Sequence, residues 1–240
     1  MMSELSWSPE EFLRRLQGHL TWARVRRKLH TLVFKSRRDD ETRQSLEVAR
    51  LFFLMAEQAF YTDAALTVYK LMSKKEDRSI VKYLNKSIHD LNRIDYPGDP
   101  LTRSDLERHL SKIKSFEGKM DRLETLRNEW LAHHDSSAFD DPDSFLSEYY
   151  VKPNELDDMI SCAQSILERH YLAFGSDFSP GLSRETDFLS IVDILKRYHE
   201  AHKMRFQDPS DLEKAVDLMF HHRHSNIEEL RSKFLDEEGA

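Results

Sequence analysis

The chain has 240 residues, of which 39% are hydrophobic and 33% are charged, and its formal net charge is −7. This composition indicates a soluble helical protein with a modest core, and only six glycines and seven prolines disfavour a β-rich or disordered chain. The single cysteine, Cys162, excludes an internal disulfide, and no segment predicts a signal peptide or a membrane span. We therefore expect a cytoplasmic protein with no membrane partner.

The first predicted helix carries a basic band. Ser8 and Pro9 are typical of a helix start, and apolar residues at helical spacing extend the helix to about Phe34. Nine Lys or Arg and no Asp or Glu lie between Arg14 and Arg38, although the rest of the chain is acidic. The band could steer phosphate groups or could be a solvated helix face. Its candidate RNA-binding residues are Arg24, Arg26, Arg27 and Lys28.

The strongest helical pattern runs from about Thr42 to Met72. Its middle, residues 51–56, is apolar on every side, which predicts a helix surrounded by other helices. Asp63 lies on the same helix, and a carboxylate on a core helix needs a partner. Asp63 could therefore brace Arg127, which lies further along the chain, or cap a neighbouring helix.

Further helices follow at shorter intervals. Thr102 or Ser104 begins a helix after a turn rich in proline and aspartate, and Gly175 ends another one. The predicted segments are residues 78–93, 104–116, 120–131, 153–174, 184–203, 210–221 and 225–235. We therefore expect an all-α fold: an antiparallel bundle of about five helices over residues 8–175, with a helical C-terminal extension over residues 176–240.

The stretch from Leu126 to Asp135 combines an arginine and a histidine where the helical pattern gives way to a polar loop. The planar fork of Arg127 suits phosphate, and His133 can take and give protons near neutral pH. Together they could cut RNA without a metal, with His133 as the acid–base and Arg127 stabilising the charge on the phosphate.

The spacing of the two residues limits how they could cooperate. Six positions of an α-helix turn by about 600°, so Arg127 and His133 would point about 120° apart. Either the helix ends and His133 bends back, or Arg127 works beside the histidine of a second copy in a symmetric dimer. His134 lies seven residues after Arg127, on the same helical face, and is an alternative acid–base.

The order Arg127-Asn128, three spacer residues, Ala132-His133 and then Asp135 resembles the motif of the HEPN superfamily, in the form used by its abortive-infection U-type branch. The apolar helix around residues 51–71 is similar to the long helix that precedes the motif in that branch. This resemblance covers roughly residues 8–172.

The resemblance implies a homodimeric, metal-independent endoribonuclease of a toxin or phage-defence system. It implies RNA as the substrate, an antitoxin protein as a candidate partner, no cofactor and no metal. Arg127 and His133 would be catalytic, and Asn128 would orient the phosphate or the histidine. Some HEPN toxins have a tyrosine two residues after the histidine that an antitoxin modifies, and Asp135 in that place puts this control in doubt. The candidate supporting residues are His134, Asp135 and Asp63.

Two other functional hypotheses are possible beside a metal-independent nuclease. A HEPN-like module without catalytic activity would bind proteins or RNA through the bundle and the extension. A metal-dependent enzyme would need the histidines near the C-terminus, which are His221, His222 and His224. His199 and His202 are three residues apart, whereas the zinc-protease motif needs four, so they indicate a polar helix face.

Overall fold

The computed structural model describes residues 6–133, 142–179 and 185–203, together with Lys214, Leu230, Ser232 and Lys233. Every regular element in this part of the chain is a helix, which confirms the all-α prediction. None of the described helices is long and apolar enough to cross a membrane. Residues 150–152 connect two helices and have no regular structure.

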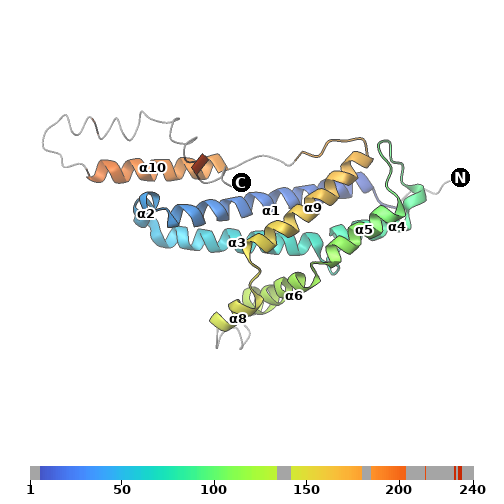
Figure 1. Cartoon of the computed structure of the whole chain (residues 1–240), viewed down its shortest axis with the longest axis horizontal. Helices are drawn as coiled ribbons and strands as arrows, with labels where there is room; N and C mark the ends of the chain where they lie inside the picture. The colour runs from blue at the N-terminus through green and yellow to red at the C-terminus, as the bar shows by residue number, and fades with distance from the viewer. Residues whose placement is uncertain are drawn as a thin grey trace. The chain divides into compact units, whose positions relative to one another are not determined.

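Figure 1 shows the helices by their labels. Two short 3₁₀ turns are η1 (Glu47–Ala49) and η2 (Leu91–Arg93). The main helices are α1 (Pro9–Arg38), α2 (Asp40–Leu46), α3 (Arg50–Met72), α4 (Ile80–His89), α5 (Arg103–Lys114), α6 (Glu117–Thr125), the π-helix η3 (Leu126–His133), α8 (Pro142–Tyr149), α9 (Pro153–Ala173) and α10 (Glu185–Lys203).

Local sequence signals determine several of these helix ends. The Ser8 hydroxyl accepts a hydrogen bond from the backbone N–H of Glu11 at the start of α1. Thr102, rather than Ser104, caps α5, and it forms a capping box with Asp105. Gly175 has a positive φ of 64° directly after α9, a conformation that favours glycine and ends the helix.

The chain forms two compact units, and the first contains residues 1–24 and 62–181. Its core is built from the buried faces of α1, α3, α4, α5 and α9. A buried polar network lies inside this core, where His170 is hydrogen-bonded to Tyr83 at 3.1 Å and to His109 at 3.3 Å. Gly98 packs so closely against the end of α9 that a Cβ there would lie 2.1 Å from the carbonyl oxygen of Leu172.

The second unit contains residues 25–61 and 182–240. Its core joins apolar residues of α1, α2, α3 and α10. The C-terminal segment therefore shares a core with an earlier part of the chain, and the division of the structure differs from the predicted boundary near residue 175. The buried members of this core are Leu32, Val33, Leu46, Phe53, Phe188, Leu189, Val192 and Leu230.

The first turns of α3 differ from the sequence prediction. The apolar segment 51–56 was expected to be enclosed, but Leu51, Phe52 and Met55 are 67%, 63% and 62% exposed. Within segment 51–56 only Phe53 is buried, because the core of the second unit contacts one side of α3 there. The even distribution of apolar residues therefore does not reflect packing on all sides.

Candidate active site

The Arg–His motif lies on a π-helix, which directly continues α6. Residues Leu126 to His133 form this element, so the backbones of Arg127, Asn128 and His133 belong to one segment. π-Helical turns are rare and are frequently found at functional sites. Their i→i+5 hydrogen bonds widen the turn, so α-helical geometry does not fix the angle between Arg127 and His133.

Three neighbours hold the guanidinium group of Arg127. Its Nη1 donates to Glu76 Oε1 at 3.1 Å, and its Nε donates to Asn128 Oδ1 at 3.0 Å. The group also lies over the ring of Tyr69, 4.6 Å from the ring centre. The Arg127 side chain is 32% exposed. Its orientation is therefore defined, while part of the group remains open to a ligand.

The loop between α3 and α4 brings further charges to the same region. Lys74 Nζ lies 3.0 Å from Glu117, and Lys75 forms an ion pair with Glu124, so both lysines reach α6. The hydrogen bond to Glu124 raises the pKa of Lys75, and the hydrogen bond from Lys74 lowers the pKa of Glu117. Cations near Arg127 are thus paired with carboxylates, which a bound phosphate would have to displace.

Contacts to α8 and α9 fix the position of the motif helix. Arg122 of α6 donates to the carbonyl oxygen of Tyr150 at 3.1 Å and to the carboxylate of Glu155 at 3.0 Å. Leu126, the first residue of η3, is buried against Phe145 of α8. The end of α6 and the start of the π-helix are therefore anchored by residues that follow them in the chain.

The structure brings together some of the predicted site residues. Arg127 and Asn128 are in direct contact, and the backbone of His133 lies at the end of the same helix. The side chain of His133 is not described, and His134 and Asp135 lie outside the described residues. The pairing of Arg127 with His133 or His134 therefore stays a prediction.

The carboxylate that pairs with Arg127 is Glu76, a residue that sequence reasoning missed. Asp63, which was expected to brace Arg127 or to cap a neighbouring helix, is exposed on α3, and its role stays a prediction. Glu76 is 51 residues from Arg127 in a charged loop, and no periodic pattern links the two. The only signal was the loss of helical pattern at residues 73–77.

The basic band of α1 is not uniformly open to solvent. Arg24 is half-buried, and its Nη1 has no hydrogen-bond partner among the described residues. Arg27 contacts Thr31 and also His30, whose Nδ1 lies 3.2 Å from its Nη1. Lys28 is exposed and Arg26 is half-buried. Binding of RNA by these four residues stays a prediction.

Cys162 and the histidines outside the Arg–His motif are the other candidate chemical groups. Cys162 is half-buried, and burial raises the pKa of its thiol, which disfavours a reactive thiolate. Within the described residues, no three His, Cys, Asp or Glu side chains are grouped as metal ligands would be. The histidines at 221, 222 and 224 lie outside the described part of the chain, and so does the side chain of His202.

The helical fold and the Arg127–Asn128 pair on the motif helix are those of a HEPN-like protein. The chain matches the HEPN family model described as AbiU2 over residues 10–198, which is most of its length. It therefore belongs to the AbiU2 family of HEPN proteins, and the match continues past residue 172, where the resemblance seen in the sequence ended. No curated protein and no solved structure matches the chain.

Proposed function

We propose that the chain is a metal-independent endoribonuclease of the toxin or phage-defence type. The main support is the state of Arg127, which is held by Glu76, Asn128 and Tyr69 yet remains one-third exposed. A cation fixed in this way is suited to bind a phosphate and to stabilise the charge that develops on it. The same π-helix carries His133, a candidate acid–base.

The proposed reaction uses the ribose 2′-hydroxyl as the nucleophile. His133 accepts the proton of this hydroxyl, the O2′–phosphorus bond forms, and the bond from phosphorus to the 5′ oxygen of the next nucleotide breaks. The protonated His133 then gives this proton to the leaving oxygen. The products are a 2′,3′-cyclic phosphate and a free 5′-hydroxyl, and DNA resists because it lacks the 2′-hydroxyl.

Asn128 and His134, which directly follow Arg127 and His133 in the chain, have distinct proposed roles. Asn128 accepts a hydrogen bond from Arg127 Nε, so it would orient the arginine and leave Nη2 for the phosphate, while Nη1 is paired with Glu76. His134 stays an alternative to His133 as the acid–base. We further propose that two copies associate, so that Arg127 of one copy works with the histidine of the other.

A gel assay on total RNA with EDTA present tests this proposal. We expect the intact protein to cut RNA, and we expect Arg127→Ala and His133→Ala to lower the rate by about 100-fold or more. Arg103→Ala is the matched control, because Arg103 is an exposed arginine at the start of α5 that pairs with Glu107. Cleavage that survives in both motif variants would contradict the assigned roles.

The alternative function is a HEPN-like binding module without catalytic activity. The ion pair between Arg127 and Glu76 favours it, because this contact also gives the arginine a structural partner. This alternative predicts intact RNA in the gel assay for all variants. It also predicts that RNA or protein binding persists in His133→Ala.

A further inference from the structure

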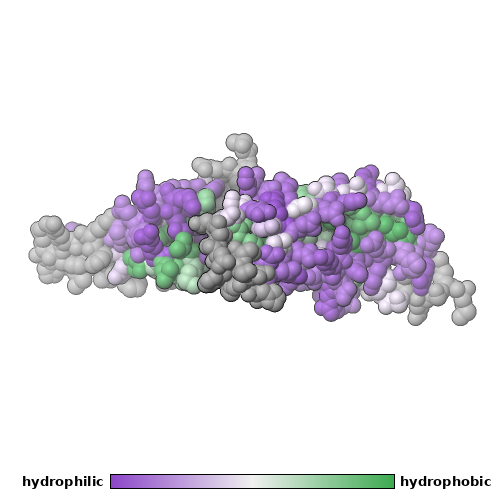
Figure 2. Space-filling view, turned by 90° about the horizontal axis from the view of Figure 1, so that it is seen from below, coloured by the Kyte–Doolittle hydropathy of each residue, from purple (hydrophilic) through white to green (hydrophobic). Residues whose placement is uncertain are grey.

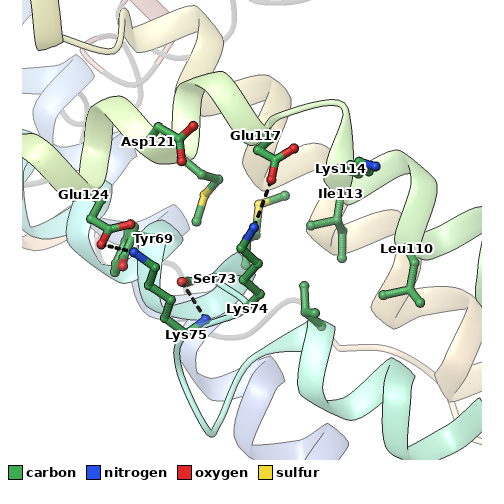
Figure 3. Close-up of a pocket in the computed structure, with 13 residues that line it drawn as sticks. Tyr69, Ser73, Lys74, Lys75, Leu110, Ile113, Lys114, Glu117, Asp121 and Glu124 are labelled. Carbon is green, nitrogen blue, oxygen red and sulfur yellow. Dashed lines mark hydrogen bonds and ion pairs between the residues drawn. The ribbon is translucent and has the colours of Figure 1, made fainter.

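A cavity of about 410 Å³ lies between the end of α3, the loop that follows it, α5 and α6 (Figure 3). The volume is within the range of roughly 300–1,000 Å³ that is usual for small-molecule sites. Buried side chains form an apolar lining, among them Tyr69, Met72, Ile113 and Met120. Such a lining suits the flat face of a ring.

Tyr69 connects this cavity to the candidate active site. Its ring lies beneath the guanidinium group of Arg127, and the same side chain lines the cavity. The residue is 1% exposed, and its hydroxyl has no hydrogen-bond partner among the described residues. A buried hydroxyl without a partner is unfavourable, so a ligand that places a polar atom there gains a hydrogen bond.

The rim of the cavity is charged. Lys74 and Lys75 reach across it to Glu117 and Glu124 of α6, as Figure 3 shows. Exposed ion pairs of this kind are weak, so a phosphate can replace the carboxylate as the partner of a lysine. The carboxylates can in turn accept hydrogen bonds from amino groups. A nucleotide fits this combination of an apolar lining, one hydroxyl without a partner among the described residues, and a rim that carries both lysines and carboxylates.

We propose that this cavity binds one base of the RNA, next to the phosphate that Arg127 holds. The base enters between α3 and α5, and a polar atom on its edge pairs with the hydroxyl of Tyr69. Lys74 or Lys75 then binds an adjoining phosphate. This inference rests on the proposed ribonuclease function, which supplies the phosphate at Arg127, and it means that the protein selects the base beside the cut.

Two variants alter the cavity in different ways. Tyr69→Phe keeps the ring beneath Arg127 and removes only the unpaired hydroxyl, so we expect its melting temperature to equal or exceed that of the parent. Leu110→Trp fills the cavity from α5, where Leu110 is half-buried. Ser111→Trp is the matched control, because Ser111 is exposed on the same helix and does not line the cavity.

Cleavage rates on four short RNAs that differ only in the base beside the cut give the first readout. We expect the parent and Ser111→Trp to prefer one base by roughly tenfold or more. Tyr69→Phe and Leu110→Trp should still cut but should lose most of this preference. An unchanged preference in both cavity variants would overturn the inference and would leave the ribonuclease proposal intact.

Binding of the four nucleoside 3′-monophosphates to His133→Ala protein gives a second readout that does not need cleavage. We expect one nucleotide to bind, and we expect Leu110→Trp to abolish this binding while Ser111→Trp preserves it. That result would support the cavity even if the parent cuts no RNA, in which case the ribonuclease proposal alone fails. If a nucleotide binds but the variants change neither RNA binding nor RNA cleavage, the cavity is a site for free nucleotides. That result would overturn the assignment of the cavity to RNA.

Discussion

Glu76 controls how much of the Arg127 charge is available to a phosphate. The two side chains are 33% and 32% exposed and lie 3.1 Å apart. An ion pair with this exposure stabilises by about 0.2–1 kcal/mol. We therefore expect Glu76→Gln to strengthen RNA binding by roughly two- to fivefold, because the phosphate no longer competes with a carboxylate. Fluorescence anisotropy with a labelled RNA and His133→Ala protein measures the change without cleavage.

Asp77→Asn is the control for Glu76→Gln. Asp77 lies in the same loop, is 96% exposed and pairs with Lys82 at 3.9 Å, so its removal changes the net charge equally without touching Arg127. An equal gain in both variants would indicate a general charge effect. Weaker binding by Glu76→Gln would mean that Glu76 positions Arg127 for the phosphate and does not compete with it.

At the scale of the helices, the sequence predicts the helix ends that depend on residues adjacent in the chain. Pro9 at the start of α1 and Gly175 after α9 act through their own backbone preferences, so these ends could be located in advance. The π-helix could not, because apolar residues spaced as in an α-helix continue through Leu126 into the motif. The contact of Arg127 with Glu76 depends on tertiary packing, which periodicity does not report.

Three helices of the first unit meet at a polar network that should make stability depend on pH. The pKa of His109 is lowered to about 4 and that of His170 to about 3, mainly by burial and in addition by neighbouring positive groups, which include Lys112 and Arg108 near His109. Tyr83 and His109 both lie against His170, so the core contains neutral imidazoles. A proton added to either imidazole ring would place a positive charge in the buried core.

The free energy of unfolding should therefore decrease in mild acid. Both folded-state pKa values lie below the unfolded value of about 6.5, so below pH 6.5 the unfolded state binds more protons, and stability is lost until about pH 4 for His109 and about pH 3 for His170. We expect His109 and His170 to contribute a loss of roughly 2–4 kcal/mol between pH 7 and pH 5, measured by urea unfolding, and His30, whose pKa is also lowered to about 4, adds to it.

The slope of stability against pH, rather than its absolute value, tests the contribution of the network. His109→Gln removes one titrating group and should flatten the slope, whereas His89→Gln, which changes an exposed histidine of α4, should leave it unchanged. Carboxylates whose pKa is lowered, such as Asp105, lose stability only at lower pH, so the interval from pH 7 to pH 5 reports the histidines. Equal slopes for the parent and His109→Gln would refute the assignment.

At the scale of the whole molecule, the exposed apolar face of α3 needs an explanation. Leu51, Phe52 and Met55 project from the first turns of this helix and are each more than 60% exposed. Figure 2 shows a hydrophobic area at its left, over this end of α3. Contiguous apolar surface on a folded protein marks an interaction site. The proposed dimer gives this face a partner, since a two-fold axis would bring it against its own copy.

Light scattering of the purified protein tests this assignment. We expect the parent to have the mass of a dimer and the double variant Phe52→Gln/Met55→Gln to have the mass of a monomer. Both side chains are exposed, so the changes should alter the free energy of unfolding by no more than about 0.5 kcal/mol. Ribonuclease activity should fall together with the mass if Arg127 of one copy works beside His133 of the other.

Leu172→Gln separates a specific interface from a general loss of apolar surface. Leu172 is a large apolar residue of α9 that is 55% exposed and is not part of the α3 face, so its replacement should leave the dimer intact. A monomeric parent would contradict the dimer, and a dimeric double variant would place the interface elsewhere. A variant that is monomeric yet as active as the parent would instead mean that each chain contains a complete site, with Arg127 and a histidine from the same π-helix segment acting together.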